Sequence, residues 1–412
     1  MTAAAPVVLL SRNVYASLHD GTRCLVPTDE VDVRLITHPY GGTSGLDPVR
    51  FPHVSVCDTN DEEQVLAVLH WLVRRHGARR IVAVHERMLL PAARVRDAHG
   101  LPGMDLPTTL LFRDKVAMKR AVAAADAAAV PRFAELRSPA DLDAFDWSAG
   151  RKVLKSRWGV GAEDVHIVAS RAEADAVLAS LGTGGDGWEI EEYVEGPMYH
   201  CDAVVQDGAV RFAAVSRYLA KPGDFAPGSA AGSMLVDHAD PVWRRIRETN
   251  ARVLRALGLR DGVTHLEVFR TPDDALVLCE VAARPGGGGI DRIVERAYGC
   301  NLNEVAYRLQ SGVDPRLGDD AATRPARGAW AVLGFYPDDS GASPAPGIPE
   351  HRHAALGIAE HTRCDTAGSG PQGVRHCVDY RDRYVVGAAD RNALEARLAA
   401  VRSAYRSAYG GS

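Results

Sequence analysis

The sequence predicts an α/β protein with a parallel sheet in its N-terminal region and antiparallel strands in its middle region. Short apolar strands alternate with amphipathic helices through the first hundred residues, a pattern typical of a parallel sheet covered by helices. Apolar runs joined by tight turns follow and predict hairpins. A length of 412 residues exceeds what one compact core usually holds, so we expect two or three coupled domains.

The N-terminal elements follow from apolar periodicity. We predict strands at residues 6–10, 31–36 and 80–84, and helices at 62–76 and 91–99. The first strand runs into Leu10-Ser11-Arg12-Asn13 instead of a GxGxxG turn, so a dinucleotide site is not expected. Residues 101–107 read as a linker.

The middle and C-terminal elements follow from turn signals. A helix from 113 to about 129 is expected to be capped by Thr108 or Thr109. Strands are predicted at 152–155, 165–168, 188–194, 200–206, 210–218, 264–270 and 276–282, helices at 171–181, 242–257 and 391–407, and a loop at 221–232. The Asp207-Gly208 pair predicts a tight hairpin turn. From about residue 324 we expect a small αβ tail.

Charge and composition exclude several classes of protein. The net charge of −5 argues against a general nucleic-acid binder. No apolar stretch is long enough for a membrane-spanning helix, and residues 1–10 do not resemble a signal peptide, so a cytoplasmic location is expected. The seven cysteines form no CxxC pair and are expected to be free thiols.

Lysine is rare in this chain. Of 48 basic residues only five are lysine, at positions 115, 119, 152, 155 and 221. A chain that otherwise uses arginine is expected to keep lysine where a compact ammonium is needed. This pattern points to Lys115 and Lys155.

Two carboxylates interrupt the apolar strands 264–270 and 276–282. The turn between these strands places Glu267 and Glu280 side by side, and Arg284 shares the face of Glu280. Two such carboxylates can hold one or two Mg²⁺ ions that bridge nucleotide phosphates, while the arginine grips an anion. A buried Glu–Arg pair that serves only the fold is the alternative.

Two further segments have the form of a nucleotide site. Lys155 ends a strand that enters a turn with Gly159, Gly161 and Ala162, whose amides can cover phosphate oxygens. The strand that includes Glu191, Tyr193 and Val194 ends in an irregular link whose free peptide groups can pair with an adenine edge. A plain hairpin and a plain strand end are the alternatives, and no GxxxxGK[ST] loop is present.

Taken in order, these motifs resemble the ATP-grasp superfamily over roughly residues 1–310. The segments His265-Leu-Glu267 and Glu280-Val-Ala-Ala-Arg284 resemble its L-amino acid ligases, dipeptide synthetases and carnosine-synthase-like enzymes. The resemblance implies an N-terminal pre-ATP-grasp domain (1–106), a nucleotide-binding subdomain (107–195), a catalytic subdomain (196–323) and a C-terminal αβ lobe (324–412). The C-terminal lobe either closes over the pocket or makes a dimer contact.

The resemblance also implies roles for individual residues. Lys115 and Lys155 contact ATP phosphates, the turn 159–162 closes as a lid, and the backbones of Glu191 and Val194 hold adenine. Glu267 and Glu280 bind Mg²⁺ (or Mn²⁺), Arg284 stabilises the transferred phosphoryl group, and the amides of Gly287 and Gly288 form an oxyanion site.

The chain departs from the family at two positions. Many relatives have Asn where this chain has Ala282, which removes one metal ligand. Many have Glu where this chain has Met198, so the ribose contact is left to Glu195 or His200.

Five residues are candidates for substrate contact besides Arg284. They are His200 and Asp202 on one strand face, Tyr218, Ser233 and His265. Asp202 pairs either with a substrate ammonium or with Arg217 or Lys221. His265 faces the site with Glu267 or is a hydrogen-bonded core histidine, and Tyr218 is a contact or a packing residue.

The resemblance implies an ATP-dependent ligase that joins two amino acids, as a dipeptide or a γ-glutamyl product, through an acyl phosphate and with release of ADP and phosphate. Its partners are small-molecule amino acids, with a homodimer as an option, and natural-product biosynthesis is the expected setting. The alternatives are an ATP-grasp ligase for another carboxylate and a nucleotide-binding regulatory protein without turnover.

Overall fold

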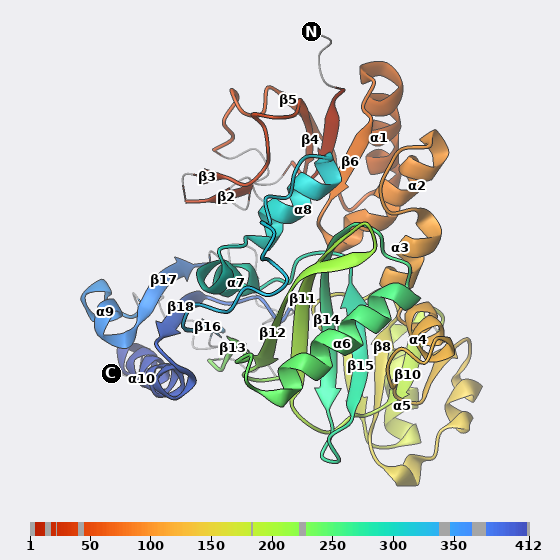
Figure 1. The fold of residues 1–412 in the computed structure, drawn as a ribbon. Helices are drawn as coiled ribbons and strands as arrows, with labels where there is room; N and C mark the ends of the chain where they lie inside the picture. Colours follow the sequence, from red (N-terminus) through yellow and green to blue (C-terminus); the bar gives the residue numbers. More distant parts are fainter. Residues whose placement is uncertain are drawn as a thin grey trace.

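The computed structural model describes residues 5–12, 18–21, 23–39, 45–182, 184–221, 228–337, 347–364 and 376–409. The strands of the described residues form three larger sheets and one short hairpin, and helices pack around them. In Figure 1 the N-terminal sheet lies at the top, and the two later sheets lie below it. No described helix is both long and apolar enough to cross a membrane.

The N-terminal sheet is parallel, as expected. Its order is β5 (His53–Val56), β4 (Val33–Thr37), β1 (Val7–Leu10) and β6 (Arg80–Ala83). Helix α1 (Glu62–His76) has the predicted bounds, begins at the capping side chain of Asp61 and ends at Gly77 with φ +67°. Helix α2 (Leu89–His99) begins two residues earlier than expected, and β5 was not predicted. A short hairpin, β2 (His19–Asp20) with β3 (Arg23–Cys24), lies beside this sheet.

The prediction of one helix from 113 to 129 is wrong. The chain forms α3 (Leu106–Arg113) and α4 (Lys115–Ala124), separated by Asp114, whose backbone is extended at φ −94°, ψ 106°. Asp105 and Asp114, and not a threonine, cap the two helices through their carboxylates. This break places Lys115 at the first residue of α4.

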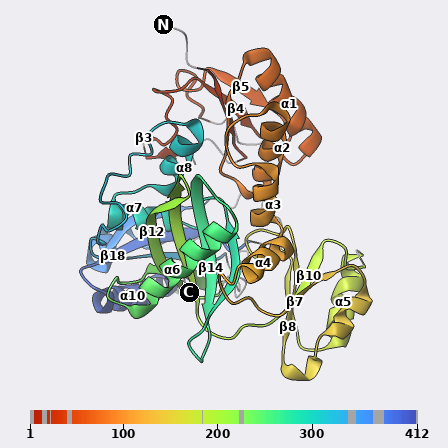
Figure 2. The same ribbon diagram turned by 45° about the vertical axis from the view of Figure 1, so that its right-hand side comes forward.

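A four-stranded sheet follows, and Figure 2 shows it standing apart from the rest of the chain with α5 on one face. Its order is β7 (Phe133–Leu136), β10 (Trp188–Glu192), β8 (Lys152–Ser156) and β9 (Val165–Val168), all antiparallel. Helix α5 spans the predicted Arg171–Leu181. Strand β10 ends at Glu192, two residues earlier than expected, and β7 was not predicted.

The largest sheet has eight strands. Its order is β15 (Leu276–Ala282), β14 (Gly262–Arg270), β11 (Met198–Gln206), β12 (Ala209–Tyr218), β13 (Ala230–Leu235), β16 (Ala329–Phe335), β18 (Asp382–Ala388) and β17 (Ile358–Arg363). The predicted loop at 221–232 is therefore partly wrong, because β13 begins at Ala230; residues 222–227 lie outside the described residues. The Asp207-Gly208 turn has the positive φ angles, 53° and 75°, that its sequence predicts.

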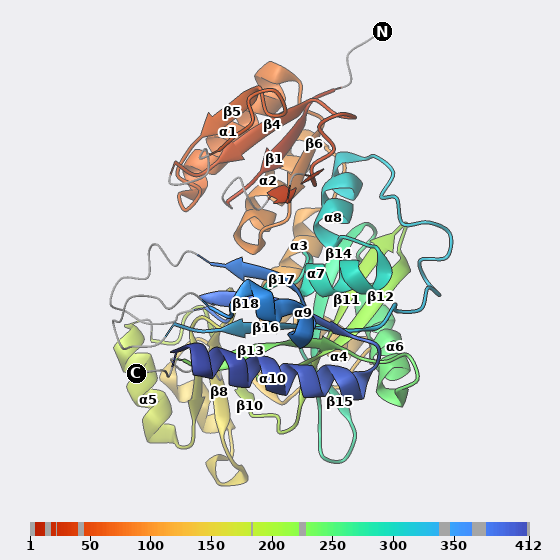
Figure 3. The same cartoon turned by 90° about the vertical axis from the view of Figure 1, so that its left-hand side faces the viewer.

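Strand β16 joins the C-terminal segment to the same sheet. It pairs with β13 on one side and β18 on the other, so the segment after residue 324 continues the sheet. Helix α6 (Pro241–Ala256) covers one face near β11 and β12. Two helices lie between β15 and β16 in the chain, α7 (Ile290–Tyr298) and α8 (Leu302–Ser311). Two more follow β16, α9 (His353–Leu356) and α10 (Arg391–Tyr409), and Figure 3 shows α10 running along the C-terminal strands.

Candidate active site

A cavity of about 860 Å³ lies where these parts meet. It is bordered by the N-terminal region, the four-stranded sheet, the large sheet and the C-terminal segment. Of the residues predicted to form the site, sixteen line it: Lys115, Lys155, Gly159, Gly161, Ala162, Glu191, Tyr193, Val194, Tyr218, Ser233, His265, Glu267, Glu280, Arg284, Gly287 and Gly288. His200 and Asp202 do not.

The two strand carboxylates face each other. Glu267 of β14 and Glu280 of β15 are register partners, and the register shifts at the next residue. The hydroxyl of Tyr218 donates to Glu267 Oε1 at 2.6 Å, and Lys115 Nζ lies 3.0 Å from Glu280 Oε2. Although burial favours the neutral acid, the ammonium groups of Lys115 and Lys155 lower the pKa of Glu280 to about 2. Within the described residues the second oxygen of each carboxylate accepts no hydrogen bond, so the pair fits an oxygen-liganded cation such as Mg²⁺.

Three of the five rare lysines line the cavity, namely Lys115, Lys155 and Lys221. Lys115, Lys119, Lys152 and Lys155 are all buried, which is unusual for this residue type. Lys155 Nζ lies 2.7 Å from Glu191, and Lys119 contacts Glu189 at 2.6 Å as well as Glu191 at 2.5 Å. Burial opposes the charge of Lys155, but the Glu191 carboxylate raises its pKa well above the ordinary value. Lys155 is therefore a fixed cation at the cavity wall.

The end of strand β10 borders the same cavity. Glu191 is paired on both sides, with Val153 of β8 and Phe133 of β7, and its side chain holds the two lysines. Val194 lies beyond the strand, and in the described structure its peptide groups make no backbone hydrogen bond. The backbone N–H and C=O groups that could pair with a planar base are therefore those of Val194. Glu191 uses its backbone groups within the sheet, and its carboxylate holds Lys119 and Lys155.

The glycine-containing turn after β8 is held from three sides. Lys115 Nζ donates to Gly159 O at 2.8 Å, and the N–H of Cys377 donates to Gly161 O at 3.1 Å. Arg87 forms an ion pair with Glu163 at 2.7 Å. A Cβ on Gly161 would lie 1.8 Å from His376 Nε2, so this turn packs directly against the C-terminal segment.

Arg284 is positioned by a residue that the sequence did not reveal. Its Nε donates to Glu86 at 2.6 Å, and Glu86 also accepts from Arg113 at 2.7 Å. Burial favours the neutral acid at Glu86, but the two guanidinium groups lower its pKa. The only sequence signal for Glu86 was its place three residues after the end of a buried parallel strand, where polar residues often reach a site.

The predictions for His200 and Asp202 require correction. His200 is fully buried, and its two ring nitrogens contact Asp202 at 2.6 Å and Ser233 at 2.9 Å. It therefore has no nitrogen left for a ribose. Asp202 pairs with His200 and with His265 at 2.8 Å, not with Arg217 or Lys221. Arg217 is opposite Tyr199, whose side chain points to the other face of β11.

His265 links this buried pair to the cavity. Its Nδ1 contacts Asp202, and its Nε2 lies 3.1 Å from the Tyr218 hydroxyl and 3.3 Å from Glu267 Oε1. Burial disfavours the imidazolium, but the two carboxylates raise the pKa of His265 to about 10. His265 is thus a charged, hydrogen-bonded histidine that holds Glu267 in place.

His200, Asp202 and His265 are close enough to hold a metal ion, since their ligand atoms lie within 4.8 Å of one another. Their hydrogen bonds to each other and to Ser233 already occupy the nitrogens and oxygens concerned. We therefore interpret the cluster as a support for Glu267 and not as a second metal centre.

Comparison with known proteins agrees with this arrangement. No family model matches the chain. The L-arginine-specific L-amino acid ligase of Bacillus subtilis is 27% identical over 277 residues, which cover 64% of this chain and 66% of that ligase. The N5-carboxyaminoimidazole ribonucleotide synthase of Mycobacterium bovis is 26% identical over 58% of this chain and 54% of its own length. The matches thus span from about half to just under two thirds of these relatives.

Solved structures cover the chain more fully. The crystal structure of L-amino acid ligase from Bacillus licheniformis superposes with a TM-score of 0.74 and 17% identity, and covers 98% of both chains. A second structure is N5-carboxyaminoimidazole synthase from Aspergillus clavatus in complex with ADP and 5-aminoimidazole ribonucleotide. It superposes with a TM-score of 0.70 and 16% identity, and the match covers 98% of this chain and 99% of that one. The chain has the fold of these ATP-grasp ligases, and its sequence is similar to that of an L-amino acid ligase.

Proposed function

We propose that this protein is an ATP-dependent carboxylate–amine ligase that joins two amino acids and releases ADP and phosphate. The observation that carries the proposal is the convergence of Lys155, Glu267, Glu280 and Arg284 on one cavity. Nucleotide binding alone would not require an opposed carboxylate pair together with a partly buried guanidinium. This arrangement disfavours the alternative function, that of a regulatory protein that binds nucleotide without turnover.

ATP would lie between the four-stranded sheet and the large sheet. Val194 offers its peptide groups to the adenine edge, and Lys115 and Lys155 supply fixed positive charge for the phosphates. The turn with Gly159 and Gly161 covers the phosphates and excludes water.

Mg²⁺ would be held by Glu267 and Glu280, which each keep one carboxylate oxygen for it. When bound, the ion neutralises charge on the β- and γ-phosphates. Glu267 is kept in position by Tyr218 and His265, so its free oxygen has a defined direction.

The substrate carboxylate would attack the γ-phosphate beside Arg284, forming an acyl phosphate and ADP. The amine of the second substrate then attacks the acyl carbon, and phosphate leaves from the tetrahedral intermediate. Positioning and charge neutralisation account for most of such catalysis. The N–H groups of Gly287 and Gly288, which donate no backbone hydrogen bond within the described residues, suit the developing oxyanion.

Amino acids are the proposed substrates because two of the similar proteins are L-amino acid ligases. The product is an α-linked dipeptide or a γ-glutamyl amino acid, made in the cytoplasm as part of natural-product biosynthesis. A homodimer is compatible with this proposal.

The test is chromatography of nucleotides after incubation with Mg-ATP and pooled amino acids, including glutamate and nonstandard amines, followed by mass spectrometry. We expect ADP and phosphate that depend on amino acids, with a product mass equal to two substrates minus water. Formation of AMP and pyrophosphate would contradict the acyl-phosphate route. Turnover only with a carboxylate that is not an amino acid would contradict the substrate class.

A further inference from the structure

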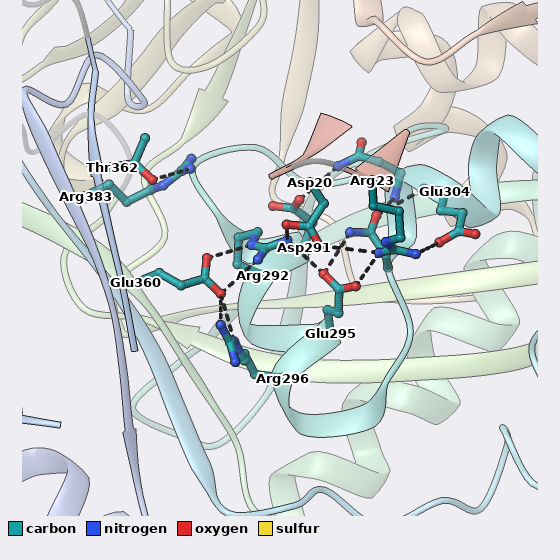
Figure 4. A network of polar contacts seen from close by, with 12 residues as sticks. Asp20, Arg23, Asp291, Arg292, Glu295, Arg296, Glu304, Glu360, Thr362 and Arg383 are labelled. Atoms are coloured by element: carbon teal, nitrogen blue, oxygen red, sulfur yellow. Dashed lines mark hydrogen bonds and ion pairs between the residues drawn. The ribbon is translucent and has the colours of Figure 1, made fainter. Parts of the chain in front are cut away.

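A charged cluster lines the end of the cavity formed by the β2–β3 hairpin, helix α7 and the C-terminal strands. Figure 4 shows its ion pairs. Arg292 contacts Asp20 at 2.7 Å, Glu295 at 2.9 Å and Glu360 at 2.8 Å. Arg23 and Arg296 are paired with acids of the same cluster. Most charges at this end are therefore already neutralised inside the protein.

Two charges are not neutralised in this way. Asp291, which lines the cavity, accepts a hydrogen bond from Asn303 Nδ2 at 3.1 Å but forms no ion pair within the described structure. Burial raises the pKa of its carboxyl group, although Arg383 and Arg292 partly offset this effect. An added cation would stabilise this carboxylate.

Arg383 is the matching unneutralised cation. It also lines the cavity, and among the described residues it forms no ion pair. Its Nη2 donates to Thr362 Oγ1 at 3.3 Å, while its buried Nε has no hydrogen-bond partner in the described structure. Of the guanidinium donors only Nη2 has an acceptor in the described structure, so donors of this cavity-lining group remain for a ligand.

The backbone brings these two residues together. A Cβ on Gly289 would lie 2.8 Å from Arg383 Cδ and 3.1 Å from its Nε, so the arginine packs across this glycine. Gly289 directly precedes helix α7, which carries Asp291 at its second residue. The two charged side chains thus come from neighbouring parts of the fold, and both line the same cavity.

We propose that Asp291 and Arg383 form the subsite for the amine-donating amino acid, which they bind as its zwitterion, with the ammonium on Asp291 and the carboxylate on Arg383. This inference rests on the proposed ligase function and assigns one of its two substrates. An α-amino acid carries opposite charges one carbon apart, which matches a neighbouring acid and base that do not pair with each other.

The assignment to the amine donor follows from the second arginine. The activated carboxylate must lie beside Arg284 and the opposed glutamates, where phosphoryl transfer would occur. The amine donor keeps its carboxylate free throughout the reaction and therefore needs a separate, permanent cation. Arg383 supplies that cation, and its planar fork is suited to a carboxylate.

The test compares two reactions of the whole protein with Mg-ATP. In the first, hydroxylamine replaces the amine and traps the acyl phosphate of each proteinogenic amino acid as a hydroxamate. In the second, each proteinogenic L-amino acid is the amine donor, supplied either free or as its primary amide, for example L-alanine against L-alaninamide. Arg383→Leu and Asp291→Asn are the test variants. Arg296→Leu and Glu304→Gln are the controls, because both residues belong to the cluster but do not line the cavity.

We expect both test variants to keep hydroxamate formation and to raise the KM of the free amino acid as amine donor roughly ten- to a hundredfold. Arg383→Leu should also remove the preference for the free acid over the amide, and Arg383→Lys should restore part of it. The controls should behave as the wild type does.

An unchanged amine-donor KM, or an equal loss in the hydroxylamine reaction, would overturn the subsite while leaving the ligase function intact. Absence of hydroxamate from every amino acid with the wild-type protein would instead overturn the proposed function, and the subsite with it.

Discussion

Arg284 Nε donates to the carboxylate of Glu86 at 2.6 Å, across 198 positions of sequence. The guanidinium that we propose to contact the transferred phosphoryl group is therefore oriented by a residue three positions after the last strand of the N-terminal parallel sheet. Arg113 shares the same carboxylate at 2.7 Å. The N-terminal region thus contributes to the geometry of the arginine that we propose as catalytic.

Glu86→Gln should lower kcat by roughly tenfold or more while changing the KM of ATP little, because the amide holds the guanidinium less firmly. Steady-state kinetics with the amino-acid pair that the nucleotide assay identifies would measure the effects on kcat and on KM separately. Glu62→Gln, which breaks an exposed ion pair with Arg94 in the same N-terminal region and away from the cavity, is the control. A loss seen equally in kcat and in ATP affinity would argue against a positioning role.

Glu280→Gln should abolish ligase turnover while ATP binding stays measurable, since one of two opposed cation ligands is lost. Product formation would be followed by mass spectrometry and ATP binding by calorimetry. Asp274→Asn, at the exposed tip of the same hairpin, should retain activity. If Glu280→Gln keeps full turnover, Glu280 is not the Mg²⁺ ligand that we propose.

Lys119→Met should destabilise the protein by about 3–5 kcal/mol, because it leaves Glu189 and Glu191 buried with one cation fewer. Urea unfolding would measure the change. Lys152→Met is a matched control, since that buried lysine contacts the carbonyl oxygen of Gly150 and no carboxylate. We expect it to cost about 1 kcal/mol, and equal losses would contradict the importance of the ion pairs.

Gly161→Ala should reduce turnover, because the new Cβ would meet the imidazole of His376. Gly182→Ala is the control, since Gly182 has a similar φ of +65° but nothing within 4 Å of the added Cβ. Both variants carry the backbone strain of about 1 kcal/mol, so only the contact differs. Adding His376→Ala to Gly161→Ala should restore turnover, and failure to do so would place the effect elsewhere.

Stability should depend on pH through His265, whose native pKa of about 10 lies above the ordinary value of 6.5. Above pH 6.5 the native state holds a proton that the unfolded state lacks, so unfolding releases it. The contribution is complete below pH 6.5 and is lost as the pH rises towards 10. Relative to His265→Gln, the wild-type free energy of unfolding should fall by up to about 1.4 kcal/mol per pH unit in this window. If the difference in free energy of unfolding between the wild type and His265→Gln is the same at pH 7 and pH 9, the histidine is not charged as proposed.

The pattern of local sequence was sufficient for the parts of the site that lie within one hairpin. Side chains alternate along strands, so the facing of Glu267 and Glu280 followed from the turn between them. The same rule placed His200 and Asp202 on one strand face and His265 on the face of Glu267; the pairing of β11 with β14 then puts Asp202 opposite His265. The rule did not say that this side is closed at His200, where Ser233 from β13 covers the ring. The predicted ribose and ammonium contacts failed for that reason.

The sequence by itself determined the α/β class, the parallel N-terminal sheet, the hairpin of the carboxylates and the importance of the rare lysines, because each depends on periodicity, turn chemistry or residue choice over a short span. Only the tertiary structure decided that Glu86 orients Arg284 and that Lys119 and Lys155 share Glu191. It also decided that Asp291 and Arg383 line the cavity without forming an ion pair in the part of the chain that the structure describes. These relations join segments far apart in the chain. Pairing of buried charges depends on which groups the fold brings within a few ångströms, and no local pattern encodes that distance.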